Sequence, residues 1–252
     1  MPLDNGKLVF RNDFTGYYDG TTINTGATYL GGGVGLIGVE EGSIATTIDE
    51  TGGVLAITTD TGDNNNHALV AGRFSPSEGT ITVKARWKIG HLTGAVFFGL
   101  QETVVIATPV MGATFSSSTM TYGDIGGVVG IQYDFDGTTD DYRAVMGDNQ
   151  AAISDSSNGI RANADVTVDR WVESVVNLYP DGSAEVYFGH VGDVNAAGEP
   201  ELRLVKHFTT GTLLTPTDIF TAMLMFENRS GDARTHEVDL FEGFAGRNWA
   251  SA

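Results

Sequence analysis

The alternation of apolar and polar residues over residues 80–89 constrains the fold of this chain more than any other feature of its sequence. From Ile81 to Ile89 every second residue is apolar, and the residues between them are polar or basic. A period of two residues is typical of a strand with one buried and one solvated face, as in an antiparallel sheet. Helical periodicity is nearly absent elsewhere, so the sequence predicts an all-β fold.

Turn-forming residues divide the chain into about a dozen short strands, which indicates an antiparallel β-sandwich or barrel. The clearest hairpin turn is Pro180-Asp181-Gly182, because proline fixes an early turn dihedral and glycine supplies a positive φ. No linker or repeat divides the sequence, so we expect one sandwich domain over residues 1–252. The expected strands cover residues 7–10, 34–39, 54–59, 68–74, 80–89, 95–101, 129–135, 170–179, 183–188, 202–208, 218–226 and 236–244.

Two stretches depart from regular alternation. Residues 102–126 are rich in Ser and Thr, and a loop of this length is usually functional unless it forms an extra edge strand and a surface loop. Residues 219–226 are apolar on both faces, which requires a covering segment or another subunit. An insertion at about 102–126 that folds over the sheet is the simpler explanation.

Composition excludes several classes of protein. The chain has 14 basic and 32 acidic residues, a net charge of −18, and no cysteine. This charge argues against direct nucleic-acid binding and against anionic membranes, and the missing cysteine excludes disulfides, thiol nucleophiles and Cys-ligated zinc. The start of the sequence lacks signal-peptide features, and no apolar run approaches the ~20 residues of a membrane helix. We therefore expect a soluble, unprocessed globular protein.

Three carboxylates near the end of the sequence are the main candidates for catalysis. Glu237, Asp239 and Glu242 share one face of a strand only if the strand carries a β-bulge. Their spacing resembles the catalytic strand of laminarinase- and carrageenase-type glycosidases, which implies Glu237 as nucleophile, Asp239 as orienting group and Glu242 as general acid/base. The tryptophans that flank the cleft of those enzymes are missing, so we expect no enzyme activity and interpret the strand as a solvated one.

Asp134 and Asp136 form a second acidic candidate. They alternate before Gly137, as carboxylates do in calcium loops, although the full loop signature is absent. A hairpin turn with side-chain-to-backbone hydrogen bonds explains the same residues. The histidines have no metal-ligand spacing, and we expect no cofactor.

Several segments together resemble one fold family. Their order resembles the concanavalin-A-like (LamG-like) jelly roll from about Phe10 to Phe244, and more narrowly the tailed-phage virion proteins of that fold. The segments are 10–16, 52–65, 82–87, 95–100, 130–136, the hairpin at 180–182 and the strand at 237–239.

The resemblance implies a capsid decoration protein, assembled in the host cytoplasm and bound as a homotrimer to the major capsid protein lattice on the outer surface of the virion. The candidate contact surfaces are an N-terminal arm of about 1–18, the insertion at 102–126 and the strand at 219–226.

The alternative is a carbohydrate-binding, lectin-like module for host or surface adhesion, with glycans as partners. Such a site needs an exposed aromatic platform with polar neighbours. The sequence offers Trp249, Tyr122 and Tyr17 as candidates for that platform. A glycosidase built on Glu237, Asp239 and Glu242 is the third hypothesis.

Overall fold

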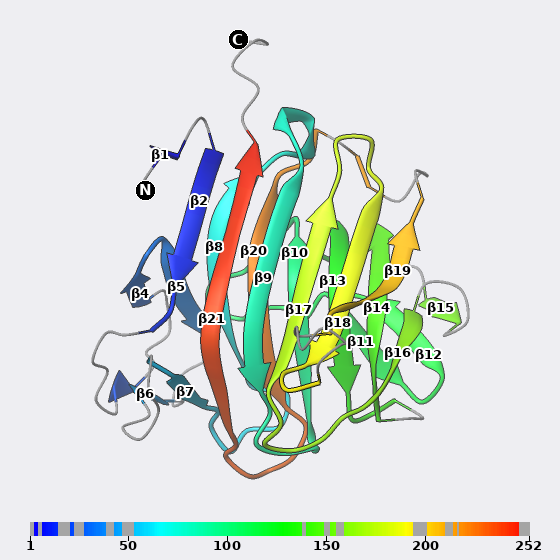
Figure 1. Cartoon of the computed structure of the whole chain (residues 1–252). Coiled ribbons are helices and arrows are strands. Elements are labelled where there is room, and N and C mark those ends of the chain that lie inside the picture. The colour runs from blue at the N-terminus through cyan, green and yellow to red at the C-terminus, as the bar shows by residue number, and fades with distance from the viewer. Residues whose placement is uncertain are drawn as a thin grey trace.

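Two large antiparallel sheets face each other, as the alternation predicts (Figure 1). The computed structural model describes residues 3–4, 7–14, 21–22, 28–38, 43–46, 53–137, 140–148, 152–154, 159–193, 201–209, 214–215 and 217–246. In these ranges no helix is long and apolar enough to cross a membrane.

The front layer in Figure 1, sheet A, has its strands in the following spatial order. It runs β19 (Arg203–Phe208), β18 (Ala184–His190), β17 (Val172–Leu178), β9 (Ile81–Lys88), β21 (Thr235–Gly246), β7 (Leu55–Thr58), β6 (Ser43–Thr46) and β3 (Thr21–Thr22). Only the first half of β21 pairs with β7. On the same side, the second half of β21 pairs with β2 (Lys7–Asn12), and β2 pairs in turn with β1 (Leu3–Asp4).

The second layer, sheet B, lies behind sheet A (Figure 1). Its spatial order is β16 (Gly159–Asp165), β14 (Asp141–Asp148), β13 (Gly127–Asp134), β10 (Gly94–Gln101), β20 (Phe220–Asn228), β8 (Asn66–Phe74), β5 (Val34–Gly38) and β4 (Thr28–Gly31). A short 3-10 turn, η1 (Pro76–Glu78), connects β8 to β9 and so joins the two layers.

The main hydrophobic core fills the space between the sheets. Every apolar residue of the predicted alternation in β9 is buried there, and Trp87 is fully buried. The ring of Trp87 in sheet A lies 5.5 Å from that of Phe98 and 6.3 Å from that of Tyr142, which both belong to sheet B, so this side chain bridges the two sheets. The residues between the buried ones in β9 are threonine, lysine or arginine and are partly exposed, which confirms the one-sided burial of this strand.

A third, three-stranded sheet covers the outer face of sheet B. This sheet C consists of β11 (Ala113–Ser116), β12 (Thr119–Tyr122) and β15 (Ala152–Ser154). Phe115 and Met120 of sheet C form a second buried cluster with Met223 and Met225 of β20. The two-sided apolar pattern of residues 219–226 therefore has the expected explanation, a covering segment. That segment forms its own sheet and is not an edge strand of a main sheet.

Polar side chains of sheet B anchor the cover. The amide Nε2 of Gln101 donates to the carbonyl oxygens of Thr103 (2.7 Å) and Val110 (3.0 Å). A carboxylate oxygen of Asp134 accepts the backbone N–H of Phe115 at 2.8 Å. Because the side chains of Gln101 and Asp134 are buried, these hydrogen bonds replace those with water and hold the insertion against the sheet.

Candidate functional site

The strand β21 carries the bulge that the carboxylate hypothesis required. Its pairing with β9 shifts between Val238 and Leu240, so that Asp239 is the extra residue opposite Arg86. Glu237, Asp239 and Glu242 are all partly exposed, and their neighbours Val238 and Phe241 point into the core. The three carboxylates therefore share the outer face of sheet A.

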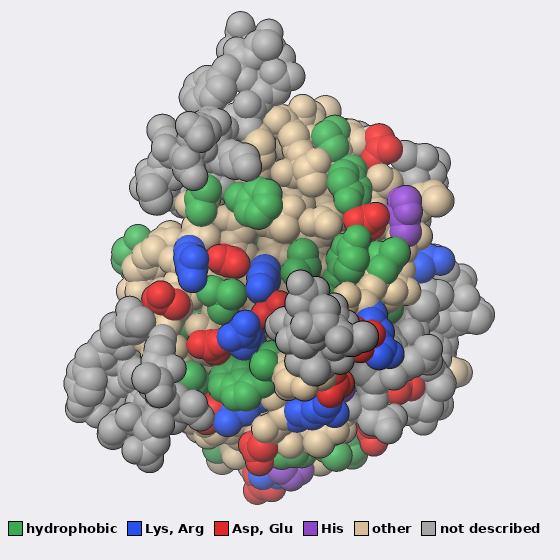
Figure 2. Space-filling model, viewed as in Figure 1, with side chains coloured by type: hydrophobic (Ala, Val, Ile, Leu, Met, Phe, Trp, Pro, Cys, Tyr) green, Lys and Arg blue, Asp and Glu red, His purple; other side chains and the backbone are tan. Residues whose placement is uncertain are grey.

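Each of these carboxylates pairs with a cation. The ion pairs are Lys88–Glu237 (2.7 Å), Arg86–Asp239 (2.8 Å) and Arg11–Glu242 (3.7 Å), and Glu173 of β17 pairs with Lys84 (3.0 Å) and Arg86 (2.8 Å). We call these residues the charge ladder; Figure 2 shows blue and red side chains interleaved across this face. A retaining glycosidase needs two carboxyl groups free to reach the sugar from positions about 5–5.5 Å apart. The ladder instead uses Glu237 and Asp239 to join neighbouring strands.

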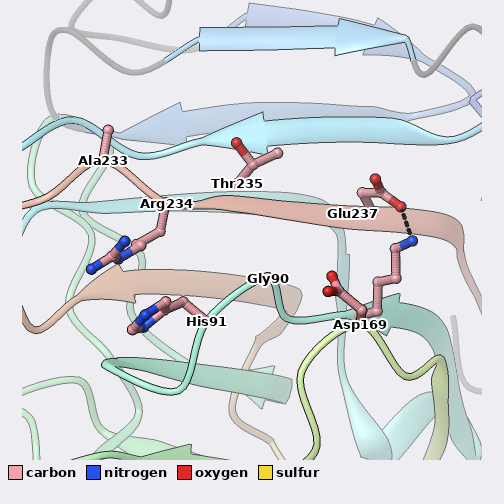
Figure 3. A pocket seen from close by; sticks show the side chains of 8 residues that line it. Gly90, His91, Asp169, Ala233, Arg234, Thr235 and Glu237 are labelled. Carbon is pink, nitrogen blue, oxygen red and sulfur yellow. Dashed lines mark ion pairs between the residues drawn. The ribbon is translucent and has the colours of Figure 1, made fainter.

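A pocket of about 280 Å³ opens beside one end of the ladder (Figure 3). It lies where the end of β9, the start of β21 and the turn before β17 meet. We call it the strand-end pocket; its lining residues are Lys88, Gly90, His91, Asp169, Ala233, Arg234, Thr235 and Glu237.

Local backbone constraints build this pocket. A Cβ atom on Gly90 would lie 2.0 Å from the carbonyl oxygen of Thr235, so only glycine lets the chain after β9 approach β21 this closely. Asp169 has a positive φ of 59°, and its N–H donates to the carbonyl of Ile89 at 2.9 Å. A non-glycine residue in this conformation costs free energy and is common at functional sites.

Hydrogen-bond donors and acceptors line different sides of the pocket. His91 accepts the N–H of Thr93 on Nδ1 at 3.0 Å, so the neutral ring carries its proton on Nε2 as a donor. Figure 3 shows His91 and Arg234 on one side, with Asp169 and Glu237 on the other. The Nε atom of Arg234 is buried and has no hydrogen-bond partner among the described residues.

An aromatic ring stands next to this polar set. The ammonium of Lys88 lies 5.1 Å from the ring centre of Trp171, the residue immediately before β17. Trp171 is partly exposed. The pocket therefore presents donors, acceptors and a neighbouring apolar ring to one polar molecule.

A larger hollow of about 530 Å³ lies on the outer face of sheet B, beside the cover. Its floor comes from β5, β8 and β20 and its wall from residues 102–106. We call it the sheet-B groove; it is lined by Gly33, Ile37, Val70, Ala71, Gly72, Arg73, Glu102, Thr103, Val104, Ile106 and Thr221. Tyr29 is 74% exposed and lies at the edge of this groove. Its hydroxyl accepts the N–H of the lining residue Gly33 at 3.3 Å.

The acidic candidate at Asp134 and Asp136 has a different environment from a calcium loop. The oxygens of Asp134 accept hydrogen bonds from Nη2 (3.0 Å) and Nε (3.3 Å) of Arg229, besides that of Phe115. The N–H of Asp136 donates to Asp134 Oδ1 at 3.2 Å, which is the turn interaction of the alternative interpretation. Among the described residues, no three His, Asp or Glu side chains gather as a metal ion requires.

None of the three expected aromatic platforms is an exposed ring among the described residues. Tyr122 was predicted to be exposed, and this is wrong: it is 3% exposed and donates its hydroxyl to the carbonyl of Met146 at 2.6 Å. Gly147 makes the room for it, because a Cβ there would lie 2.3 Å from the Tyr122 ring. Trp249 and Tyr17 lie outside the described residues. Sequence reasoning missed Trp171 and Tyr29, since neither stands in a motif.

The sequence matches no protein-family model and no curated protein. Among solved structures, peanut lectin superposes with a TM-score of 0.54 at 10% identity, over 95% of this chain and 97% of the lectin. The fold is a legume-lectin-like, concanavalin-A-like β-sandwich. The Lotus tetragonolobus seed lectin gives 0.53 at 11% identity, over 90% of this chain and all (100%) of that one. A protein of unknown function from Shewanella oneidensis MR-1 gives 0.54 at 12% identity, over 98% and 90%.

Proposed function

We propose that this protein is a non-catalytic carbohydrate-binding domain and that the strand-end pocket is its glycan site. The observation that carries this proposal is the meeting of two carboxylates, Asp169 and Glu237, with the donors His91 and Arg234 around one small pocket. Sugar hydroxyls donate and accept hydrogen bonds at once, so they pair with both kinds of group. The ring of Trp171 beside the pocket supplies an apolar surface for the C–H face of a sugar.

Two further observations support a binding role. Peanut lectin and the Lotus tetragonolobus seed lectin share the fold, although at 10–11% identity this likeness concerns the fold alone. The carboxylates Glu237 and Asp239 are engaged by Lys88 and Arg86, which favours binding over hydrolysis. We expect the purified protein to release no reducing sugar from β-glucans or carrageenans.

A glycan array followed by calorimetry on the best ligand tests the proposal. We choose Asp169→Asn because asparagine tolerates the positive φ at this position while removing the charge. We expect affinity for the selected glycan to fall at least tenfold in this variant. The matched control is Asp193→Asn, an exposed carboxylate paired with Arg170 on the β17–β18 side of the sheet. Absence of any glycan ligand, or equal affinity in both variants, would refute the proposal.

We propose virion decoration as the second candidate function, with the protein as a homotrimer on the outer capsid lattice after assembly in the host cytoplasm. The observation that favours it is the outer face of sheet A. There the four cations and four carboxylates of the charge ladder balance, in a chain of net charge −18. Phe244 (41% exposed) and Leu204 (49%) lie on the same face. A neutral, partly apolar face suits contact with another protein.

Co-sedimentation tests this second candidate. We expect the purified protein to pellet with expanded, DNA-filled heads of the virus that encodes it, and light scattering to give a trimer. The variant Phe244→Asp should no longer pellet with the heads, and its melting temperature should equal that of the wild type. Wild-type protein that stays in the supernatant, at concentrations where glycan binding is intact, would leave only the carbohydrate-binding role.

A further inference from the structure

We propose that the sheet-B groove is a second ligand site, specific for a saccharide that carries a carboxylate, such as a uronic acid. Tyr29 provides the stacking platform and Arg73 the partner of the carboxylate. The ligand class rests on the proposed carbohydrate-binding function, whereas the site is separate from the strand-end pocket.

The strand register brings Tyr29 to the edge of an open apolar floor. Tyr29 pairs with Gly35, Gly35 with Val70, and Val70 with Met223, so these side chains form one row across sheet B. Met223 lies in the buried cluster under sheet C, which places the row on the outer face of the sheet. Beyond the cover, Val70 and Tyr29 therefore face solvent on either side of a glycine.

Gly35 leaves the floor open without a structural need for glycine. A Cβ atom added there would meet its nearest atoms at 3.7 Å and 3.8 Å, which is ordinary contact, and its φ is not in the positive region. Any small residue would therefore fit the strand. What glycine adds is space beside the Tyr29 ring, of the kind that a bound ring would fill.

The groove also offers a wall and a fixed aromatic edge. Val104 and Ile106 line one side, and Ile106 is 52% exposed. The hydrogen bond from Gly33 to the Tyr29 hydroxyl fixes one end of the aromatic side chain at the groove. An exposed aromatic face beside aliphatic side chains suits the C–H face of a pyranose ring, and the hydroxyls of Thr103 and Thr221 in the lining suit its oxygens.

Arg73 is the charged group that selects the ligand. Six other arginines pair with carboxylates: Arg11, Arg86, Arg170, Arg203, Arg229 and Arg234. Arg73 is exposed, lines the groove and has no ion-pair partner among the described residues. A guanidinium that no side-chain carboxylate of the described residues engages, beside an aromatic platform, is available to pair with an anionic ligand.

The charge balance of the groove favours a monoanion. Glu102 also lines the groove, and its Oε2 accepts the N–H of Gly127 at 2.8 Å. The Glu102 carboxylate is engaged by that backbone N–H, and Arg73 is the single cationic side chain of the lining, so one ligand carboxylate is the anionic group that the groove can pair. The planar guanidinium of Arg73 matches a planar carboxylate through two parallel hydrogen bonds.

Calorimetry with oligogalacturonate, and with a neutral galactose oligomer of the same length, tests this inference. We expect the wild type to bind the uronate, and Tyr29→Ala and Arg73→Gln each to weaken that binding at least tenfold. Gly35→Val should block the groove, with an unchanged melting temperature as the control for folding. Asp169→Asn and the remote Arg203→Gln should leave uronate affinity unchanged.

The outcomes separate the two sites. Uronate binding that survives Arg73→Gln, or that is lost in Asp169→Asn, would overturn the groove assignment. Neutral-glycan binding that depends on Asp169, without any uronate binding, would overturn this inference and leave the proposed function standing. No binding of either oligomer, together with an empty glycan array, would remove both. Preference for a sulfated oligomer over the uronate would overturn the carboxylate specificity.

Discussion

At the scale of single residues, Arg229 is a mostly buried cation that contacts two buried carboxylates. Its guanidinium contacts Asp134 at 3.0 Å and Glu227 at 2.5 Å, and the side chains of all three are at most 10% exposed. Burial raises the pKa of Asp134 and of Glu227, and the charge of Arg229 opposes that rise. One cation therefore compensates two buried carboxylates that join β13 and β20.

Replacing Arg229 with methionine keeps an unbranched apolar stem and removes the charged guanidinium. Both carboxylates then remain buried without a cation, which costs about 3–5 kcal/mol of the free energy of unfolding. Urea denaturation at neutral pH measures the loss. The control is Arg203→Met, whose exposed pair with Glu201 should leave the midpoint unchanged. An Arg229→Met loss as small as that of the control would show that the cluster is solvated.

The same cluster predicts a pH dependence. Because the fold raises the pKa of Asp134 and Glu227, the native state binds protons more tightly than the unfolded state, and their contribution to stability grows as pH falls. We expect the stability difference between wild type and Arg229→Met to shrink from about pH 7 to about pH 5, as the unpaired carboxylates take up protons. Burial lowers the pKa of His236 to about 3, so acid destabilises both proteins through this residue, and its effect cancels in the difference. A difference that widens toward pH 5 would contradict the assignment.

At the scale of elements, the bulge in β21 sets which side chains face outward. Val238 pairs with Trp87 and Leu240 with Arg86, so Asp239 is additional to the ladder of β9. Neither β7 nor β2 pairs with Asp239 on the other side. In a regular strand, Glu242 would face the opposite side of the sheet from Glu237 and Asp239. The bulge places all three carboxylates on the same face.

Deletion of Asp239 is therefore expected to preserve the fold. The deletion joins Val238 directly to Leu240, and these two residues already pair with consecutive residues of β9. Only the Arg86–Asp239 ion pair is lost. Deletion of Val176 in β17 is the matched control, because this strand pairs regularly on both sides and a missing residue reverses the facing of its remainder. Near-UV circular dichroism should show native packing in the first deletion and none in the second. Loss of structure in both would mean that the bulge itself is required.

The burial of each strand also decides whether the sequence predicts it. Strands buried on one face, such as β9, show their alternation in the sequence and were predicted correctly. The strand β14 was missed because its residues 142–147 are all buried between the main core and sheet C, and the buried Arg143 interrupts the apolar run that marks other fully buried strands. Two-sided burial removes the period of two. The strand-end pocket had no local signal either, since it depends on the approach of Gly90 to Thr235 across the sheet.

At the scale of the whole molecule, charge is distributed unevenly. The charge ladder is balanced, so the net charge of −18 belongs to the rest of the chain. Surplus carboxylates repel one another and destabilise the compact state, whereas the close pairs of the ladder stabilise it. These two effects respond to salt in opposite directions.

Repulsion should dominate, and we expect the melting temperature to rise as salt increases from about 0.01 M to about 0.2 M. Over this range the Debye length falls from ~30 Å to below ~10 Å, which screens dispersed like charges more than pairs at contact distance. Differential scanning calorimetry measures the change. A variant with Asp63→Asn, Glu78→Gln and Asp124→Asn removes three exposed carboxylates and should show a smaller rise. A melting temperature that falls with salt would mean instead that the ladder outweighs the surplus charge, and that the outer face of sheet A is a main source of stability.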